Sequence, residues 1–244
     1  NEMRICVAQS KPIKEDIVAN IEQHKKFIHL AIYSKADVIV FPELSITGYE
    51  PTLARGLAMD ASDTRLDSLQ QIADLHGIII GAGIPMKCGD GINITMVLFH
   101  PNAQRQTYSK KYLHADEEPF FISGENNATC IRGSNVELAI CYEISVPEHS
   151  ANAGKNGGKI YLASVAKSAN GVKEAHQTLS GIAAKYGMTV LMANSVGPSD
   201  DFVGAGGSAI WDKKGKLASQ LGSDCEGLLI VDTETLEVDA REFY

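Results

Sequence analysis

The sequence predicts an α/β domain in which helices pack on sheets, and three features of the chain support this prediction. Short apolar runs typical of strands alternate with segments of helical periodicity, an order that favours a layered α/β fold. The 244 residues, 44% of them hydrophobic, are enough to bury one large core. No linker or low-complexity tract divides them, so we expect a single domain over residues 1–244.

The first half of the chain alternates strands and helices and then predicts a β-hairpin. Residues 15–34 and 63–76 carry apolar side chains at near-helical spacing, which predicts two helices. The strand-like runs around them are residues 3–9, 37–41 and 77–83. Residues 100–104 have the composition of a turn, so we expect the two strands of the hairpin at 92–99 and 105–113.

The second half of the chain continues the alternation. An apolar run at 136–141 predicts a strand, and the segment after it predicts a helix at 148–155. A second helix is expected at 173–186. The remaining expected strands are residues 159–164, 188–195, 206–211 and 227–231.

Charge and composition exclude two classes of partner. The net charge is -8 and the isoelectric point is about 5.4, so we expect no binding to nucleic acid. No apolar run approaches the roughly 18 residues that a membrane span requires, so we expect no membrane partner. The first residues lead directly into a strand-like run, which is not the pattern of a signal peptide.

The cysteines predict neither a disulfide framework nor a metal site. Their number is odd, their spacing is wide, and no two of them form a C-x-x-C pair. This usage fits a reducing cytoplasm and leaves one of the thiols available as a reactive group. The five are Cys6, Cys88, Cys130, Cys141 and Cys225.

Cys141 ends a strand-like run at the point where the chain turns. A polar segment follows at once, and Pro147 stands at the start of a predicted helix. A thiol in this position would lie at the mouth of a sheet, and the next backbone N–H groups could point at the group that it attacks. This is a common way to build a nucleophile with an oxyanion hole. The alternative is that Cys141 is a small buried hydrophobic residue, as most free cysteines are.

Two charged residues could complete such a site. Glu43 stands just past the end of a buried strand, where ligand sites form in α/β sheets, and partial burial would raise its pKa toward that of a general base. Lys110 and Lys111 face opposite sides if residues 105–113 form a strand, so one ammonium could stabilise charge in the site. The alternatives are a solvated or helix-capping Glu43 and two solvated lysines at a sheet edge. We favour the solvated role for Lys111.

Four segments resemble the motifs of the nitrilase superfamily of carbon–nitrogen hydrolases, and they occur in the family's order and at its usual separations. The resemblance covers essentially the whole chain. The segments are Phe41–Leu44 with Thr47–Tyr49, Tyr108–Leu113, Ile140–Glu143 with Pro147–Glu148, and Gly206–Ser208.

The resemblance implies a four-layer αββα sandwich of the nitrilase type that pairs into homodimers, and a Glu–Lys–Cys triad. Glu43 would act as general base, Lys110 as electrostatic support and Cys141 as nucleophile. The backbone N–H of Tyr142 would help Lys110 to hold the oxyanion. The implied chemistry requires neither a metal nor a cofactor.

Further residues are candidates by position. A second glutamate often completes the sites that this chain resembles, seven residues after the lysine. Glu117 holds that position here, and its neighbour Glu118 stays open. Candidates to line the pocket or touch the substrate are Tyr49, Phe120, Phe121, Tyr142 and Ser164.

The resemblance implies thiol-dependent hydrolysis of a small amide or carbamoyl compound. Relatives often carry an arginine where this chain has Ser145, so an acidic substrate is not assumed. Nitrilases tend to follow the cysteine with Trp-Glu, whereas Tyr142 stands here, which favours amide over nitrile hydrolysis. The alternatives are nitrile hydrolysis or acyl transfer at the same site, a pair of Cys141 with His114 or His149, and a catalytically silent binding scaffold.

Overall fold

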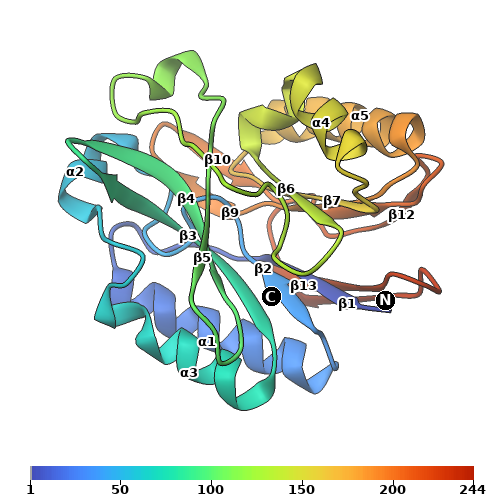
Figure 1. Cartoon of the computed structure of the whole chain (residues 1–244), viewed down its shortest axis with the longest axis horizontal. Helices are drawn as coiled ribbons and strands as arrows, with labels where there is room; N and C mark the ends of the chain where they lie inside the picture. Colours follow the sequence, from blue (N-terminus) through green and yellow to red (C-terminus); the bar gives the residue numbers. More distant parts are fainter. Residues whose placement is uncertain (1) are drawn as a thin grey trace.

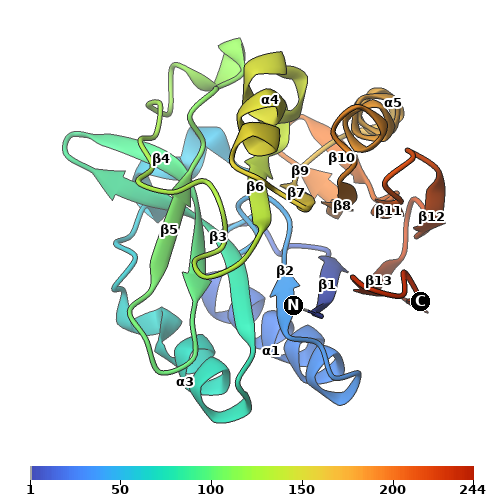
Figure 2. The ribbon, with the colours of Figure 1, turned by 45° about the vertical axis from the view of Figure 1, so that its right-hand side comes forward.

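The computed structural model describes residues 2–244 and has the four-layer architecture that the resemblance implies (Figure 1). Helices α1 (Ile17–Tyr33) and α3 (Asp67–His76) cover the outer face of a seven-stranded sheet. Helices α4 (Pro147–Lys155) and α5 (Ala169–Tyr186) cover the outer face of a five-stranded sheet. Figure 2 shows the two pairs of helices on opposite sides of the stacked sheets.

The seven-stranded sheet has the strand order β14-β13-β1-β2-β3-β4-β5. Strand β2 pairs in parallel with β1 and β3, and the other neighbours are antiparallel. The strands are β1 (Arg4–Gln9), β2 (Val38–Val40), β3 (Ile79–Cys88), β4 (Gly91–Phe99), β5 (Gln106–Ser109), β13 (Glu226–Asp232) and β14 (Val238–Phe243).

The five-stranded sheet has the strand order β12-β11-β8-β7-β6. Strand β7 pairs in parallel with β6 and β8, and β11 and β12 are antiparallel additions. The strands are β6 (Val136–Ile140), β7 (Ile160–Ser164), β8 (Thr189–Ala193), β11 (Ala209–Trp211) and β12 (Leu217–Gln220). A separate hairpin consists of β9 (Val196–Ser199) and β10 (Phe202–Ala205).

Three apolar layers hold the sandwich together. Val7 and Leu138 belong to the central layer between the two sheets. Cys6, the neighbour of Val7, belongs to the layer under α1 and α3, and Ala163 belongs to the layer under α4 and α5. The central strands are therefore buried on both faces, which is why their sequences are continuous apolar runs instead of alternating ones.

Local signals set the ends of the helices. Asp16 caps α1, because its side chain accepts the backbone N–H of Ala19 at 3.0 Å, and such a cap contributes about 1 kcal/mol. Helix α3 ends at Gly77, whose φ of 68° lies in the left-handed region. Ser168 caps α5, so this helix begins at Ala169 and not at residue 173 as expected.

Three expected strand boundaries are wrong. Strand β3 continues to Cys88 and does not end at residue 83, because it pairs with β4 along its whole length. Strand β5 ends at Ser109 and not at residue 113. The N–H of Lys110 still donates to Ile94 of β4, but those of Lys111 and Tyr112 donate to the side chain of Glu143. The strand expected from Gly206 begins only at Ala209, since Gly206 and Gly207 have φ values of 53° and 63°.

The search for apolar runs did not predict β9, β10, β12 or β14. Strands β12 and β14 are the edges of the two sheets, and their side chains are largely exposed or half-buried. An edge strand of this kind needs no apolar run, so composition does not distinguish it from a loop.

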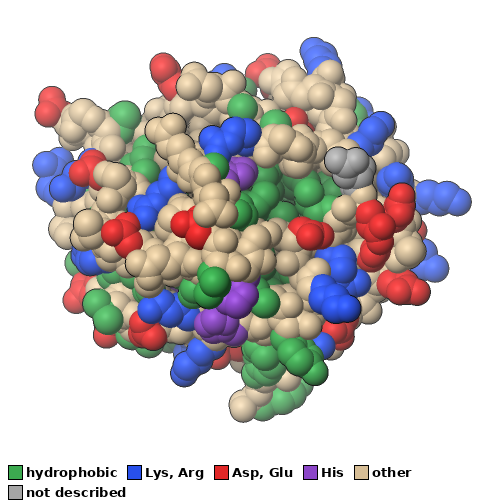
Figure 3. Space-filling model, turned by 60° about the horizontal axis from the view of Figure 1, so that its bottom comes forward, with side chains coloured by type: hydrophobic (Ala, Val, Ile, Leu, Met, Phe, Trp, Pro, Cys, Tyr) green, Lys and Arg blue, Asp and Glu red, His purple; other side chains and the backbone are tan. Residues whose placement is uncertain are grey.

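The surface carries charges of both signs. On the face that Figure 3 brings forward, acidic and basic side chains lie interspersed. Among residues 2–244, none of the helices combines the length and the apolar character that crossing a membrane requires.

Gly83 in β3 leaves room for the loop that follows β2. A Cβ on Gly83 would lie 2.4 Å from the backbone nitrogen of Leu44 and 2.9 Å from its Cα, so a side chain cannot fit unless this loop moves. We expect Gly83→Ala to lower the free energy of unfolding by about 1–3 kcal/mol in urea denaturation.

Gly181→Ala is the matched control, because nothing lies within 4 Å of a Cβ at this position in α5. It should leave the free energy of unfolding unchanged or raise it by about 0.5–1 kcal/mol. Equal losses in the two variants would contradict the close packing at Gly83.

Candidate active site

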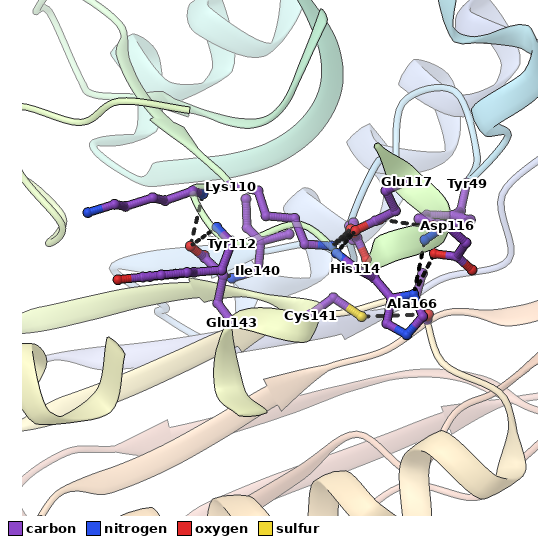
Figure 4. A network of polar contacts seen from close by, with 12 residues as sticks. Tyr49, Lys110, Tyr112, His114, Asp116, Glu117, Ile140, Cys141, Glu143 and Ala166 are labelled. Atoms are coloured by element: carbon purple, nitrogen blue, oxygen red, sulfur yellow. Dashed lines mark hydrogen bonds and ion pairs between the residues drawn. The ribbon is translucent and has the colours of Figure 1, made fainter. Parts of the chain in front are cut away.

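Four residues from distant segments meet at one end of the sandwich. Glu43 follows β2, Lys110 follows β5, and Cys141 follows β6 of the other sheet. Glu117 ends a short 3₁₀ helix at Ala115–Glu117. The carboxyl ends of parallel strands such as β2 and β6 are where α/β sheets place ligand sites. Figure 4 shows the side chains of Lys110, Glu117 and Cys141 in this region.

Lys110 is the centre of the cluster although it is a buried cation. Its side chain is 1% exposed, and Nζ donates to Glu43 Oε1 at 2.8 Å and to Glu117 Oε1 and Oε2 at 2.9 Å and 3.0 Å. Burial disfavours the ammonium, but the negative charges of Glu43, Cys141 and Glu117 together raise the pKa of Lys110 above its usual value. Lys110 therefore stays charged and fixes the two carboxylates around it.

Glu43 is placed to exchange a proton. Burial raises the pKa of its carboxyl group, and the charge of Lys110 offsets this effect only in part. Its Oε2 atom is buried and has no hydrogen-bond partner among residues 2–244. Cys141 is close enough that the thiol and the carboxyl group influence each other's pKa. A carboxylate with a free oxygen beside a thiol can act as its base.

The chain bends sharply at Cys141. This residue has a φ of 45° and begins a 3₁₀ turn at Cys141–Ser145. Its Sγ atom lies 3.8 Å from the carbonyl oxygen of Ala166. Left-handed backbone at a residue other than glycine is strained, and such strain is common at active sites. Tyr142 lies in the first turn of this short 3₁₀ helix, where a backbone N–H has no acceptor within the helix.

The Cys141 thiol is protonated at rest. Burial and the charge of Glu43 raise its pKa, while Lys167 and Lys110 lower it by less. The thiol therefore needs a base at the moment of reaction, and Glu43 is the carboxylate that lies beside it.

Glu117 is the second carboxylate of the cluster. Its side chain is 2% exposed, and it accepts the Tyr49 hydroxyl at 2.7 Å and the backbone N–H of His114 at 2.9 Å. The His114 contact closes a capping box on the 3₁₀ helix, which turns Glu117 inward. Its neighbour Glu118 is exposed, so the structure brings Glu117 and not Glu118 to Lys110.

A cavity of about 490 Å³ opens onto Cys141, Lys110 and Glu117. Tyr49 and Phe202 meet edge to face on one wall, with ring centroids 5.7 Å apart. His114 and Tyr142 make a similar pair, with ring centroids 5.3 Å apart. Other residues that line the cavity include Phe120, Ala166, Lys167, Asp116 and Asp200.

Three candidates lie outside this cavity. Ser164 is buried and its hydroxyl donates to the carbonyl oxygen of Phe41 at 2.8 Å, so it joins the ends of β7 and β2 instead of lining the cavity. Phe121 packs in the apolar layer between the sheets. Ser145, which stands where relatives often carry arginine, is exposed and does not line the cavity either.

The two candidate histidines lie in different places. His114 lines the cavity and pairs with Asp116 at 2.6 Å. His149 is buried on the other side of the Cys141 turn, where its Nε2 and Nδ1 atoms meet the hydroxyls of Tyr108 and Tyr161, each at 2.8 Å. His149 therefore faces two tyrosines and not the thiol.

Sequence reasoning missed two features of the site. Phe202 and Asp200 come from the hairpin of β9 and β10, for which the sequence holds no strong signal. Glu143 stands inside the Cys141 segment, where the sequence indicates it only as part of a motif, yet its buried side chain accepts the backbone N–H of Lys111. No group of three or more His, Cys, Asp or Glu side chains among residues 2–244 is arranged to hold a metal ion.

Comparison with known proteins shows similarity over nearly the whole chain. The family model described as carbon-nitrogen hydrolase matches residues 4–240. A glutamine-dependent NAD(+) synthetase of Xylella fastidiosa is 28% identical over 230 residues, which are 89% of this chain and 41% of that protein. The chain thus spans about two fifths of the length of this relative.

Two amidases are also similar. An (R)-stereoselective amidase of Pseudomonas sp. is 27% identical over 217 residues, which are 85% of this chain and 77% of that protein. A mutant of the amidase from Nesterenkonia sp. AN1 superposes with a TM-score of 0.84 and 26% identity, over 94% of this chain and 90% of that one. That structure shows covalent addition of the acetamide moiety of fluoroacetamide at its active-site cysteine.

Removal of the Lys110 ammonium would leave two buried carboxylates without a counter-charge. We expect Lys110→Met to lower the free energy of unfolding at pH 7 by about 3–5 kcal/mol in urea denaturation. Without the ammonium, which lowers the pKa of Glu43, the pKa of this buried carboxyl group in the folded state would rise further. A raised carboxyl pKa favours the folded state at low pH and loses that effect as the pH rises, so the deficit should shrink between pH 7 and pH 5.

Lys111→Met is the control, because the Lys111 side chain is exposed. It should change the free energy of unfolding by less than about 0.5 kcal/mol. A deficit of Lys110→Met that stayed constant with pH would contradict the proposed charge balance.

Proposed function

The chain belongs to the carbon–nitrogen hydrolase family, and we propose that it hydrolyses a small amide through a thioester on Cys141. Glu43 serves as general base and Lys110 as electrostatic support. The observation that carries this proposal is the free Oε2 atom of Glu43 beside the thiol, while its other oxygen is held by Lys110. The adjoining cavity, which combines aromatic walls with charged side chains such as Lys167 and Asp200, leaves room for a small amide.

The first half of the reaction forms the thioester. Glu43 accepts the thiol proton as the sulfur attacks the amide carbon, and the carbonyl oxygen becomes an oxyanion. The Lys110 ammonium and the N–H of Tyr142 stabilise this charge. The C–N bond then breaks, and Glu43 returns the proton to the departing ammonia or amine.

The second half of the reaction releases the acid. Glu43 takes a proton from water, the hydroxide attacks the thioester carbon, and a second oxyanion forms at the same place. The C–S bond breaks, the carboxylic acid departs, and the Cys141 thiolate regains its proton from Glu43. Glu43 thus carries one proton in each half and ends the cycle ionised.

Lys110 does not act as the base in this scheme. Its ammonium donates to two carboxylates, and its pKa is raised, so it keeps its protons through the cycle. Glu117 holds the ammonium in place from the other side, with Tyr49 and His114 holding Glu117 in turn.

The similar amidases support an amide as the substrate. The Nesterenkonia amidase forms a covalent adduct on its active-site cysteine and has also been seen in complex with butyramide. Free glutamine is a second candidate, because glutamine-dependent NAD(+) synthetases are similar over 89% of this chain. Homodimer formation and a cytoplasmic location remain predictions from the sequence.

Ammonia release across a panel of small amides, glutamine, carbamoyl compounds and nitriles would identify the substrate class. We expect at least one amide to react, and Cys141→Ala to lower that rate on the order of a hundredfold or more, because it removes the nucleophile. Ammonia release by Cys141→Ala at the wild-type rate would refute the thioester. Release from nitriles alone would show that the site acts on C≡N bonds.

Glu43→Gln tests the general base. The variant keeps the shape of the side chain but cannot accept a proton, so we expect a loss of kcat of about 10²–10⁴-fold. In the wild type, activity should fall as the pH drops through the raised pKa of Glu43, because the base becomes protonated. The exposed Glu118→Gln is the control and should retain wild-type rates. Similar kcat values for the two variants would exclude Glu43 as base.

A further inference from the structure

Glu143 is a buried carboxylate to which donors from both catalytic segments converge. Its side chain is 0% exposed. Its Oε1 atom accepts the backbone N–H of Ile140 at 2.9 Å, and its Oε2 atom accepts the backbone N–H of Lys111 at 3.0 Å. Ile140 directly precedes Cys141, and Lys111 directly follows Lys110. Figure 4 shows Glu143 between these two segments.

We infer that Glu143 is a positioning residue that holds the Cys141 segment against the Lys110 segment. This inference rests on the proposed function, in which the thiol, Glu43 and Lys110 act together. Glu143 itself does not line the 490 Å³ cavity, so it acts through the two backbone segments and not on the substrate. Side chains that carry out catalysis must be held within about 0.5 Å of the productive geometry, and such supporting contacts provide that precision.

The tie acts where regular strand pairing stops. The backbone N–H of Lys110 still donates to the carbonyl oxygen of Ile94 in β4 at 2.8 Å, and the next one, that of Lys111, donates to Glu143. Strand β5 has ended at Ser109, and the backbone of Cys141 is in the strained left-handed region. The Glu143 carboxylate replaces the missing strand partner for Lys111. It also reaches back across the turn to Ile140, which closes the bend that exposes the thiol.

A chain of hydrogen bonds directs donors at the side-chain oxygens of Glu143. The Tyr108 hydroxyl donates to Glu143 Oε1 at 2.7 Å, so its oxygen accepts from Nε2 of His149. The other nitrogen of His149 then accepts the Tyr161 hydroxyl. This donor order is that of a neutral His149, the form that burial favours by lowering the pKa of the ring. Every link therefore directs a donor toward the Glu143 carboxylate.

A glutamine at this position cannot satisfy both segments. Its amide has one acceptor oxygen and one nitrogen that only donates. If the amide oxygen faces Ile140 and Tyr108, the amide nitrogen faces the backbone N–H of Lys111. In the reverse orientation, the amide nitrogen faces the backbone N–H of Ile140. In either orientation a donor meets a donor, and one of the two segments is released.

The test measures the variants Glu143→Gln, Tyr108→Phe and Cys141→Ala against wild type, with Glu137→Gln as a control variant. Glu137 is the matched control because it is also a buried glutamate in this region, 4% exposed, whose Oε2 accepts from Thr129 at 2.6 Å. Three quantities are measured: the rate of Cys141 alkylation by iodoacetamide from pH 6 to pH 9, followed by peptide mass spectrometry; kcat and KM for ammonia release; and urea unfolding.

We expect Glu143→Gln to lower both kcat and the alkylation rate at pH 7 by about tenfold or more, with KM changed by less than about threefold. Glu137→Gln should leave kcat and alkylation within about twofold of wild type, whatever its effect on unfolding. Wild-type kcat and alkylation in a folded Glu143→Gln would overturn the inference, because a purely structural role changes unfolding alone.

If Glu143→Gln does not fold, Tyr108→Phe decides, since it removes the hydroxyl that holds the Glu143 carboxylate in place and so loosens its contacts with the two backbone segments. A fall of about threefold or more in alkylation supports the inference, and an unchanged rate overturns it. Cys141→Ala separates the two proposals. If it released ammonia at the wild-type rate, the thioester mechanism would fail, while the alkylation rates would still report whether Glu143 positions the thiol.

Discussion

The site depends on a single buried ammonium. Taking an unpaired ammonium out of water costs several kcal/mol even after the protein relaxes, so Lys110 is stable in this position only with its two carboxylates. Glu43 and Glu117 come from different segments, and their contacts with one Nζ atom fix those segments relative to each other. Two negative charges around one positive charge also leave the cluster with a net negative charge, which favours the retention of a proton by Glu43.

The stacked sheets make this cluster possible. The ends of β2 and β7 belong to different sheets, yet two hydrogen bonds connect them. The Ser164 hydroxyl donates to the carbonyl oxygen of Phe41, and the backbone N–H of Glu43 donates to the carbonyl oxygen of Val165 at 3.3 Å. These contacts join the sheets at the edge where the segments of Glu43 and Cys141 emerge. The apolar layer between the sheets sets their separation, and the polar contacts at its end set the position of Glu43.

The raised pKa values of Glu43 and Cys141 have a common cause. Glu43 is buried and Cys141 is half-buried at the cavity, and this burial penalises the charged form of each. A thiol that stays protonated at rest is a weak nucleophile, so its reactivity depends on proton transfer to a carboxylate whose pKa has been raised toward its own. This dependence makes the relative placement of the two groups decisive, and it explains why buried supporting contacts such as those of Glu143 surround the site.

The sequence by itself predicted the layered fold and the residues Glu43, Lys110 and Cys141, which the structure brings together. Helical spacing and continuous apolar runs can be recognised without a structure, and Glu43 and Cys141 stand at the ends of two such runs. Only the tertiary structure decided that Glu117 and not Glu118 meets Lys110, and that Glu143 ties the two segments together. These side chains lie in irregular turns, where the direction of a side chain does not follow from a repeating spacing in the sequence. Their orientation is set by contacts with residues distant in the chain, which a local pattern does not contain.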